Sequence, residues 1–162
     1  MDRDSDYIKI LIESLNKKVE VLDGILKENE KQKSAVSEEK INDALFEETL
    51  DNKEKYINEL NNLDVGFETV YNRVRDVLHD EESKSIYGEQ IRQLKDLIGR
   101  ITDKTLEIQR QEKSNEQLVM KKLAKERSEI TQVRNARKAA SDYYKSMNRV
   151  NYIDPQFMDR KQ

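Results

Sequence analysis

The sequence has no cysteine, one histidine, four glycines and one proline among its 162 residues. Without cysteine the chain forms no disulfide and no thiolate metal site. With His79 as the lone histidine, a metal site built on two or more imidazoles is excluded. Few glycines and a single proline leave few positions at which a helix has to end. These absences favour long helices and exclude several classes of metal site.

Reactive groups are not gathered anywhere in the pattern of a catalytic site. Carboxylate neighbours such as Glu47/Glu48 and Glu81/Glu82 lie among lysines on polar faces, whereas acid–base catalysis needs carboxylates in a shielded pocket. His79 has no suitable serine or cysteine nucleophile beside it, and no glycine-rich phosphate loop occurs. We therefore expect no enzymatic activity, no bound metal and no cofactor.

Long apolar runs are also missing. No stretch approaches the roughly 20 apolar residues that a membrane-spanning helix needs, so we expect no membrane insertion. The start of the sequence, Met1-Asp2-Arg3-Asp4, lacks the basic beginning and the apolar run of a signal peptide. The expected location is the cytoplasm.

Charge is abundant and unevenly spread. Charged residues make up 39% of the chain against 35% hydrophobic ones. Residues 116–162 carry 11 Lys and Arg against 6 Asp and Glu, a net +5, which leaves −8 for residues 1–115 from the total of −3. The basic segment is interrupted by Glu126 and Glu129, and the whole chain has a pI near 5.5. Strong nucleic-acid binders carry a larger positive excess, so we expect no nucleic-acid partner.

The spacing of apolar residues predicts an all-α protein, an antiparallel bundle of three long helices over roughly residues 5–34, 38–78 and 82–115. Each helix has a stripe of residues in alternating steps of three and four. The first stripe comprises Ile8, Ile12, Leu15, Val19, Leu22 and Leu26, widened by Leu11 and Ile25. The second comprises Phe46, Leu50, Lys53, Ile57, Leu60, Asp64, Phe67, Tyr71, Val74 and Leu78. The third comprises Tyr87, Ile91, Leu94, Ile98, Ile101, Thr105, Ile108, Glu112, Asn115 and Val119.

Helix ends are predicted from capping residues and turns. Asp4 or Ser5 is expected to cap the first helix, and Ser37 the second. Gly66 lies inside the second helix, and residues 79–83 form a turn.

The third helix is predicted to be longer than the first two and to extend beyond them. At 1.5 Å per residue it spans about 90 Å if it continues to residue 142, against about 43 Å and 60 Å for the first two helices. Residues 1–115 then form the bundle body, and residues 116–162 form a basic helical arm with nothing in its own chain to pack against.

The arm is the predicted client-binding element. Its apolar line comprises Val119, Leu123, Ile130, Val133, Tyr144 and Met147. Aromatic residues and methionine on a segment without a partner are typical of protein-docking surfaces. The alternative is a tail that folds back and completes the core of the bundle.

The sequence resembles the FlgN family of flagellar export chaperones over nearly its whole length. The resemblance rests on Tyr7-Ile8-Lys9-Ile10-Leu11 leading into Leu15-Asn16-Lys17-Lys18, on Asp51-Asn52-Lys53-Glu54-Lys55-Tyr56-Ile57, on Leu63-Asp64-Val65-Gly66-Phe67 and on Tyr143-Tyr144-Lys145-Ser146-Met147. The resemblance implies a cytoplasmic chaperone that holds the helical C-terminal parts of the hook-associated proteins FlgK and FlgL and presents them to the export-gate protein FlhA. It also implies a late tyrosine at the gate contact, for which both Tyr143 and Tyr144 are candidates.

A second hypothesis is a structural coiled-coil or adaptor protein that forms a homodimer through the same stripe. Thr105, Glu112 and Asn115 occupy stripe positions that a committed coiled coil fills with Leu, Ile or Val. These three residues favour the chaperone.

Overall fold

A computed structural model of the chain describes residues 2–125 and 130–151, with side chains described up to residue 147 and, in the last helix, from residue 134. The described residues form helices α1 (Arg3–Ser37), α2 (Asp43–His79), α3 (Glu81–Ile86), α4 (Gly88–Leu123) and α5 (Ile130–Asn151). No strand occurs among them. The predicted all-α class is confirmed.

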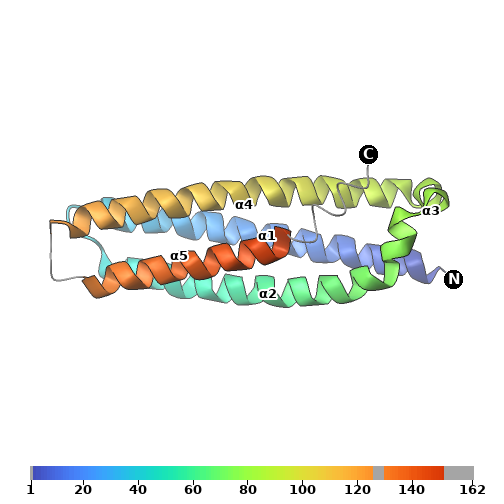
Figure 1. Cartoon of the computed structure of the whole chain (residues 1–162). Coiled ribbons are helices and arrows are strands. Elements are labelled where there is room, and N and C mark those ends of the chain that lie inside the picture. Colours follow the sequence, from blue (N-terminus) through green and yellow to red (C-terminus); the bar gives the residue numbers. More distant parts are fainter. Residues whose placement is uncertain (1, 126–129, 152–162) are drawn as a thin grey trace.

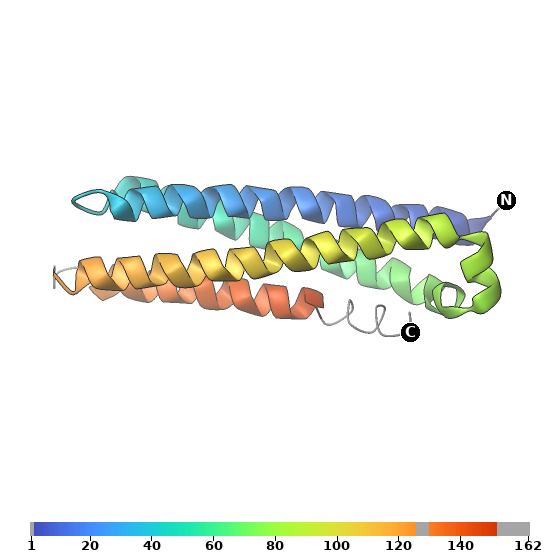
Figure 2. The ribbon, with the colours of Figure 1, turned by 90° about the horizontal axis from the view of Figure 1, so that it is seen from above.

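Four of the helices run side by side in an elongated bundle (Figure 1). Helix α1 packs extensively against both α2 and α4, and α5 returns along α4 to contact α4 and α2. The short α3 lies at the end of the bundle that also holds the N-terminus. The α1–α2 turn, the end of α4 and the start of α5 lie together at the opposite end (Figure 2).

The capping residues differ from two of the predictions. Asp2, rather than Asp4 or Ser5, caps α1. Its Oδ1 accepts hydrogen bonds from the backbone N–H groups of Asp4 at 3.1 Å and Ser5 at 3.2 Å. Ser37 is the last residue of α1, and its hydroxyl donates to the Lys33 carbonyl at 2.7 Å. A serine that bonds back to its own helix leaves the next cap to another residue.

The other boundaries follow short polar segments. Asn42 caps α2, with its Oδ1 accepting from the N–H of Leu45. Gly66 lies inside a continuous α2, as predicted, with nothing within 4 Å of an added Cβ. The turn expected at residues 79–83 is a single residue, Asp80, which ends α2 and caps α3.

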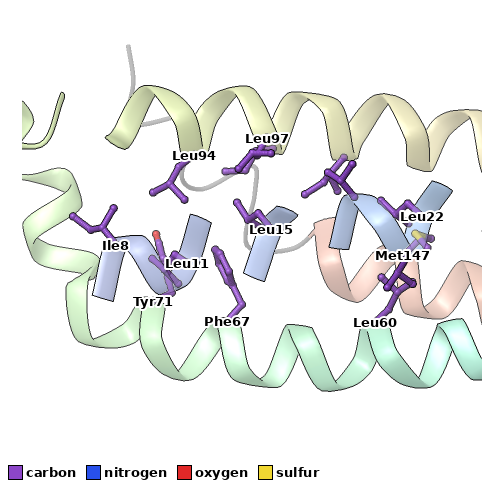
Figure 3. Close-up of a cluster of buried hydrophobic side chains, with 14 of the residues drawn as sticks. Ile8, Leu11, Leu15, Leu22, Leu60, Phe67, Tyr71, Leu94, Leu97 and Met147 are labelled. Carbon is purple, nitrogen blue, oxygen red and sulfur yellow. The ribbon is translucent and has the colours of Figure 1, made fainter. Parts of the chain in front are cut away.

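The core follows the predicted stripes. Every stripe residue of the first two helices, and of α4 up to Val119, is buried or half-buried. The larger apolar cluster joins α1, α2, α4 and α5, and Figure 3 shows part of it. A smaller cluster near the α1–α2 turn joins α1, α2 and α4 through Ala35, Val36, Phe46, Val119 and Leu123.

The expected three-helix bundle with an extended arm is not what the structure shows. Helix α4 ends at Leu123, the chain reverses, and α5 packs against α2 and α4. The boundary drawn at residue 115 falls inside α4, whose last two turns pack against α1 and α2. Residues 134–147 instead fold back onto the bundle, as the alternative prediction for the tail had it. Residues 152–162, which include the other aromatic residues of the tail, lie outside the described residues.

Candidate protein-docking surface

Helix α5 fills a groove between α2 and α4. Its side chains that are buried there are Ala140, Tyr143, Ser146 and Met147, and Tyr144 is half-buried. Met147 joins the larger apolar cluster, and Figure 3 shows it beside Leu22 and Leu60. Two of the buried side chains are small, so α5 is held by a narrow apolar line.

Beneath α5 the groove carries two charges. Lys53 in α2 and Glu112 in α4 form an ion pair, and their side chains are 2% and 4% exposed. Burial lowers the pKa of the Lys53 ammonium, because the cost of desolvation exceeds the stabilisation by Glu112. The ammonium lies 5.7 Å from the centroid of the Tyr143 ring, within the range of a cation–π contact. The face on which α5 rests is therefore partly polar.

The two tyrosines of α5 differ in environment. Tyr143 is fully buried, and its hydroxyl has no hydrogen-bond partner among the described residues. Burial raises the pKa of the Tyr143 phenol. The hydroxyl of Tyr144 donates to the Gln109 carbonyl at 3.1 Å, and partial burial raises its pKa to about 12. Of the two candidates for the gate contact, Tyr144 is the one with exposed surface.

Polar contacts at the edges of α5 fix its position along the groove. The hydroxyl of Ser146 lies 3.3 Å from Oδ1 of Asn61 in α2. Nε of Arg137 lies 3.5 Å from Oε1 of Glu116 in α4. The Arg137 side chain is 56% exposed, so this ion pair contributes little to stability.

A polar layer separates the two apolar clusters. Nδ2 of Asn115 donates to the backbone carbonyl of Asn29 at 2.9 Å and to Oε1 of Gln32 at 3.3 Å. Gln32 in turn donates to Thr49 at 3.4 Å. The stripe predicted for the third helix includes Asn115 as a polar residue, but the sequence does not identify its partners Asn29 and Gln32 on α1 or the next contact, Thr49 on α2. A buried polar residue on one stripe needs hydrogen-bond partners, so polar residues at the same level of the facing helices could have been expected.

A groove of about 510 Å³ runs between α2 and α5. Its charged lining residues are Asp51, Lys53, Glu54, Lys138, Asp142 and Lys145. Equal numbers of acidic and basic side chains give it no preference for an ion of one sign. Among the described residues, no group of three or more His, Asp or Glu is placed to hold a metal ion.

His79, the lone histidine, ends α2 and lies against a tyrosine. Its Nε2 is 3.2 Å from the Tyr71 hydroxyl. The imidazole therefore has a local structural contact at the end of a helix.

Most of the predicted client-binding residues lie inside the bundle. Val119 and Leu123 pack in the smaller cluster, Met147 is fully buried in the larger one, and Tyr144 is half-buried. The side chains of Ile130 and Val133 lie outside the described residues. For the α5 part of this line to meet a client, α5 has to leave the groove.

The fold and this surface define an all-α bundle whose last helix covers a groove. The chain matches no family of known proteins, no curated protein and no solved structure. None of the described helices combines the length and apolar character needed to cross a membrane.

Proposed function

We propose that the chain is a cytoplasmic export chaperone of the FlgN type. It binds the helical C-terminal parts of the hook-associated proteins FlgK and FlgL and delivers them to the export-gate protein FlhA. The sequence patterns at residues 7–18, 51–57, 63–67 and 143–147 support this proposal. The all-α bundle fits a protein that works by holding other helices.

The attachment of α5 is the observation that carries the proposal. Helix α1 contributes a continuous apolar stripe to the core, whereas α5 rests on a narrow line over a buried ion pair. A helix with few buried apolar contacts opens at a lower free-energy cost than the rest of a domain. Release of α5 exposes Tyr143 and Met147 together with the groove that covered them.

The released surface suits an amphipathic client helix. Its apolar residues can lie along the apolar face of the client, as in other helix-in-groove complexes. The exposed charged side chains of α5 between residues 134 and 147 are Arg134, Arg137, Lys138, Asp142 and Lys145, a net positive set. This net positive charge favours an acidic client surface and accelerates encounter, an effect that salt weakens.

Calorimetry with a purified C-terminal helical fragment of a hook-associated protein tests the proposal. The full chain is expected to bind, and a chain ending at Lys125 is expected to lose most of the affinity. This end point keeps Val119 and Leu123 in the smaller cluster, which an end at Asn115 would dismantle. Absence of binding by the full chain to both FlgK-type and FlgL-type fragments would contradict the proposal.

A cross-linked variant tests the release of α5. The pair Asn61→Cys and Ser146→Cys, joined by a short bismaleimide, ties α5 to α2 next to an observed contact. Since the chain has no cysteine of its own, the reagent acts at these two positions alone. The tied protein should fail to bind the client, while the same variant without cross-linker should bind. Equal binding by both forms would exclude the buried face of α5 from client contact.

For the export gate, we propose Tyr144 as the contact. Tyr144→Ala is expected to weaken binding to FlhA more than a substitution at the exposed neighbour Lys145. Unchanged binding by Tyr144→Ala would remove this tyrosine from the gate contact.

A further inference from the structure

The backbone directly after α4 keeps a helix-like conformation. The backbone of Ala124 is right-handed helical, with φ −60° and ψ −24°. Its N–H donates to the Met120 carbonyl at 3.0 Å, as in a further turn of the helix, and the N–H of Lys125 donates to Lys122 at 3.2 Å. The described backbone thus stays helix-like at Ala124 and tightens into a turn at Lys125.

The sequence of the connection also favours a helix. Residues 124–129 read Ala-Lys-Glu-Arg-Ser-Glu, with neither glycine nor proline, and most of them are good helix formers. The spacing of Val119, Leu123 and Ile130 keeps one stripe running from α4 into α5. Local preference is for one continuous helix, and tertiary contacts of α5 reverse the chain. A short connection with such a conflict favours the exchange of the element it carries.

We propose that α5 exchanges between two copies of this chain. In the exchanged state α4 and α5 form one long helix, and each α5 occupies the α2–α4 groove of the other copy. This inference goes beyond the proposed function and does not depend on it.

The groove is complementary to a second copy's α5, because the sequence on both sides is the same. The burial of Tyr143 and Met147, the Ser146–Asn61 contact and the Tyr144–Gln109 hydrogen bond all form between copies as they do within one. Exchange therefore needs no interface that the closed chain does not already contain.

The exchanged dimer has a defined shape. The end of α4, the start of α5 and the α1–α2 turn share one end of the bundle (Figure 2). Straightening of α4 and α5 points each α5 away from its own bundle at that end. Two copies therefore join end to end, and the particle is close to twice as long as the monomer.

Cross-linking between two single-cysteine chains tests the exchange. Chains with Asn61→Cys and with Ser146→Cys are mixed in urea, refolded together at high concentration and treated with a short bismaleimide. The exchanged dimer places the two positions side by side, so a covalent heterodimer should form in high yield. The control replaces Asn61→Cys with Glu82→Cys in α3, at the opposite end of the bundle, and should give little product.

Substitutions in the connection provide a second measurement. Ala124→Gly with Lys125→Gly removes helix preference, and should raise the dimer dissociation constant, measured by analytical ultracentrifugation, at least roughly tenfold. Lys125→Ala keeps helix preference and should leave that constant unchanged or lower. Circular dichroism checks that all variants are folded.

Three results would overturn the proposal. One is a monomer at every concentration at which the chain stays in solution. Another is a dimer in which the Asn61→Cys and Ser146→Cys chains cross-link no better than the control pair. The third is a dissociation constant that the double glycine variant leaves unchanged.

Discussion

The ring of Tyr56 in α2 lies directly against the backbone of α1 at Gly24. A Cβ placed on Gly24 would be 2.5 Å from Cζ of that ring and 2.7 Å from its hydroxyl oxygen. Glycine at this position therefore leaves room for the tip of the ring, which an added Cβ would have to displace, although α1 is an ordinary helix there. The other helix-interior glycines of α2 and α4 have open space around them.

Gly24→Ala is expected to destabilise the bundle. Alanine gains about 1 kcal/mol in helix preference, but displacement of the packed ring costs about 1–3 kcal/mol. Gly66→Ala and Gly99→Ala meet nothing within 4 Å and should stabilise by roughly 1 kcal/mol each. Urea unfolding followed by circular dichroism measures all three. In a Tyr56→Ala background, Gly24→Ala should become stabilising; a penalty that persists there would refute the role of the ring.

The Lys53–Glu112 ion pair predicts a strong asymmetry between single and double substitutions. Lys53→Met leaves the Glu112 carboxylate buried without its counterion and should cost roughly 3–5 kcal/mol of unfolding free energy. Lys53→Met combined with Glu112→Leu removes both charges and should restore most of that loss. Denaturant unfolding of Lys53→Met, of Glu112→Leu and of the double variant completes a double-mutant cycle, which measures the interaction between the two side chains. Additive losses would show that the two charges do not interact.

Tyr143 and Tyr144 predict opposite effects of the same chemical change. Tyr143→Phe removes a buried hydroxyl that has no partner among the described residues, so stability should rise by roughly 1 kcal/mol. Tyr144→Phe breaks the hydrogen bond to the Gln109 carbonyl and should cost about 0.5–1.5 kcal/mol. Each variant is the control for the other in thermal or urea unfolding. A loss of stability in Tyr143→Phe would mean that its hydroxyl has a partner.

Alkaline pH is expected to destabilise the fold through the buried phenols. Burial raises the pKa of Tyr143, and that of Tyr144 to about 12, whereas both titrate near pH 10 in the unfolded chain. The unfolded chain then holds fewer protons, so stability is complete below about pH 10 and falls as pH rises further. Lys53 acts in the opposite direction, because its pKa is lowered by burial, but only up to its unfolded value near 10.5.

Urea midpoints measured from about pH 9 to about pH 11 check this dependence. Tyr143→Phe should flatten the alkaline decline, because that variant has one fewer phenol to keep neutral. An equally steep decline in Tyr143→Phe would assign the effect to other groups. Tyr87, whose pKa is raised to about 12 by its hydrogen bond to Asp2, is the first of these.

The helices of the body could be predicted from the sequence because the apolar stripes are local and regular. Polar residues on those stripes were also visible, and two of them, Lys53 and Glu112, pair with each other. A third, Asp64, lies 3.2 Å from Nζ of Lys18, which no stripe included. These pairings depend on how facing helices are aligned along the bundle, and no single helix contains that information.

The return of α5 could not be predicted for a different reason. Reversals are recognised by glycine, proline or a capping residue, and residues 124–129 contain no glycine or proline and a single residue of the capping type, Ser128. The stripe continues in phase from α4 into α5, so the sequence gives the same pattern for an extended arm and for a helix that folds back. Contacts of Tyr143 and Met147 with distant parts of the chain distinguish the two states.

Charges inside the bundle limit sliding between helices. Apolar stripes repeat every seven residues, so on their own they allow two helices to shift by a heptad and pack again. Such a shift moves Lys53 about 10 Å away from Glu112 and strands both charges in the interior. The Lys18–Asp64 pair applies a similar penalty to sliding between α1 and α2. Although the apolar pattern is repetitive, the ion pairs therefore select one alignment of the helices along the bundle axis.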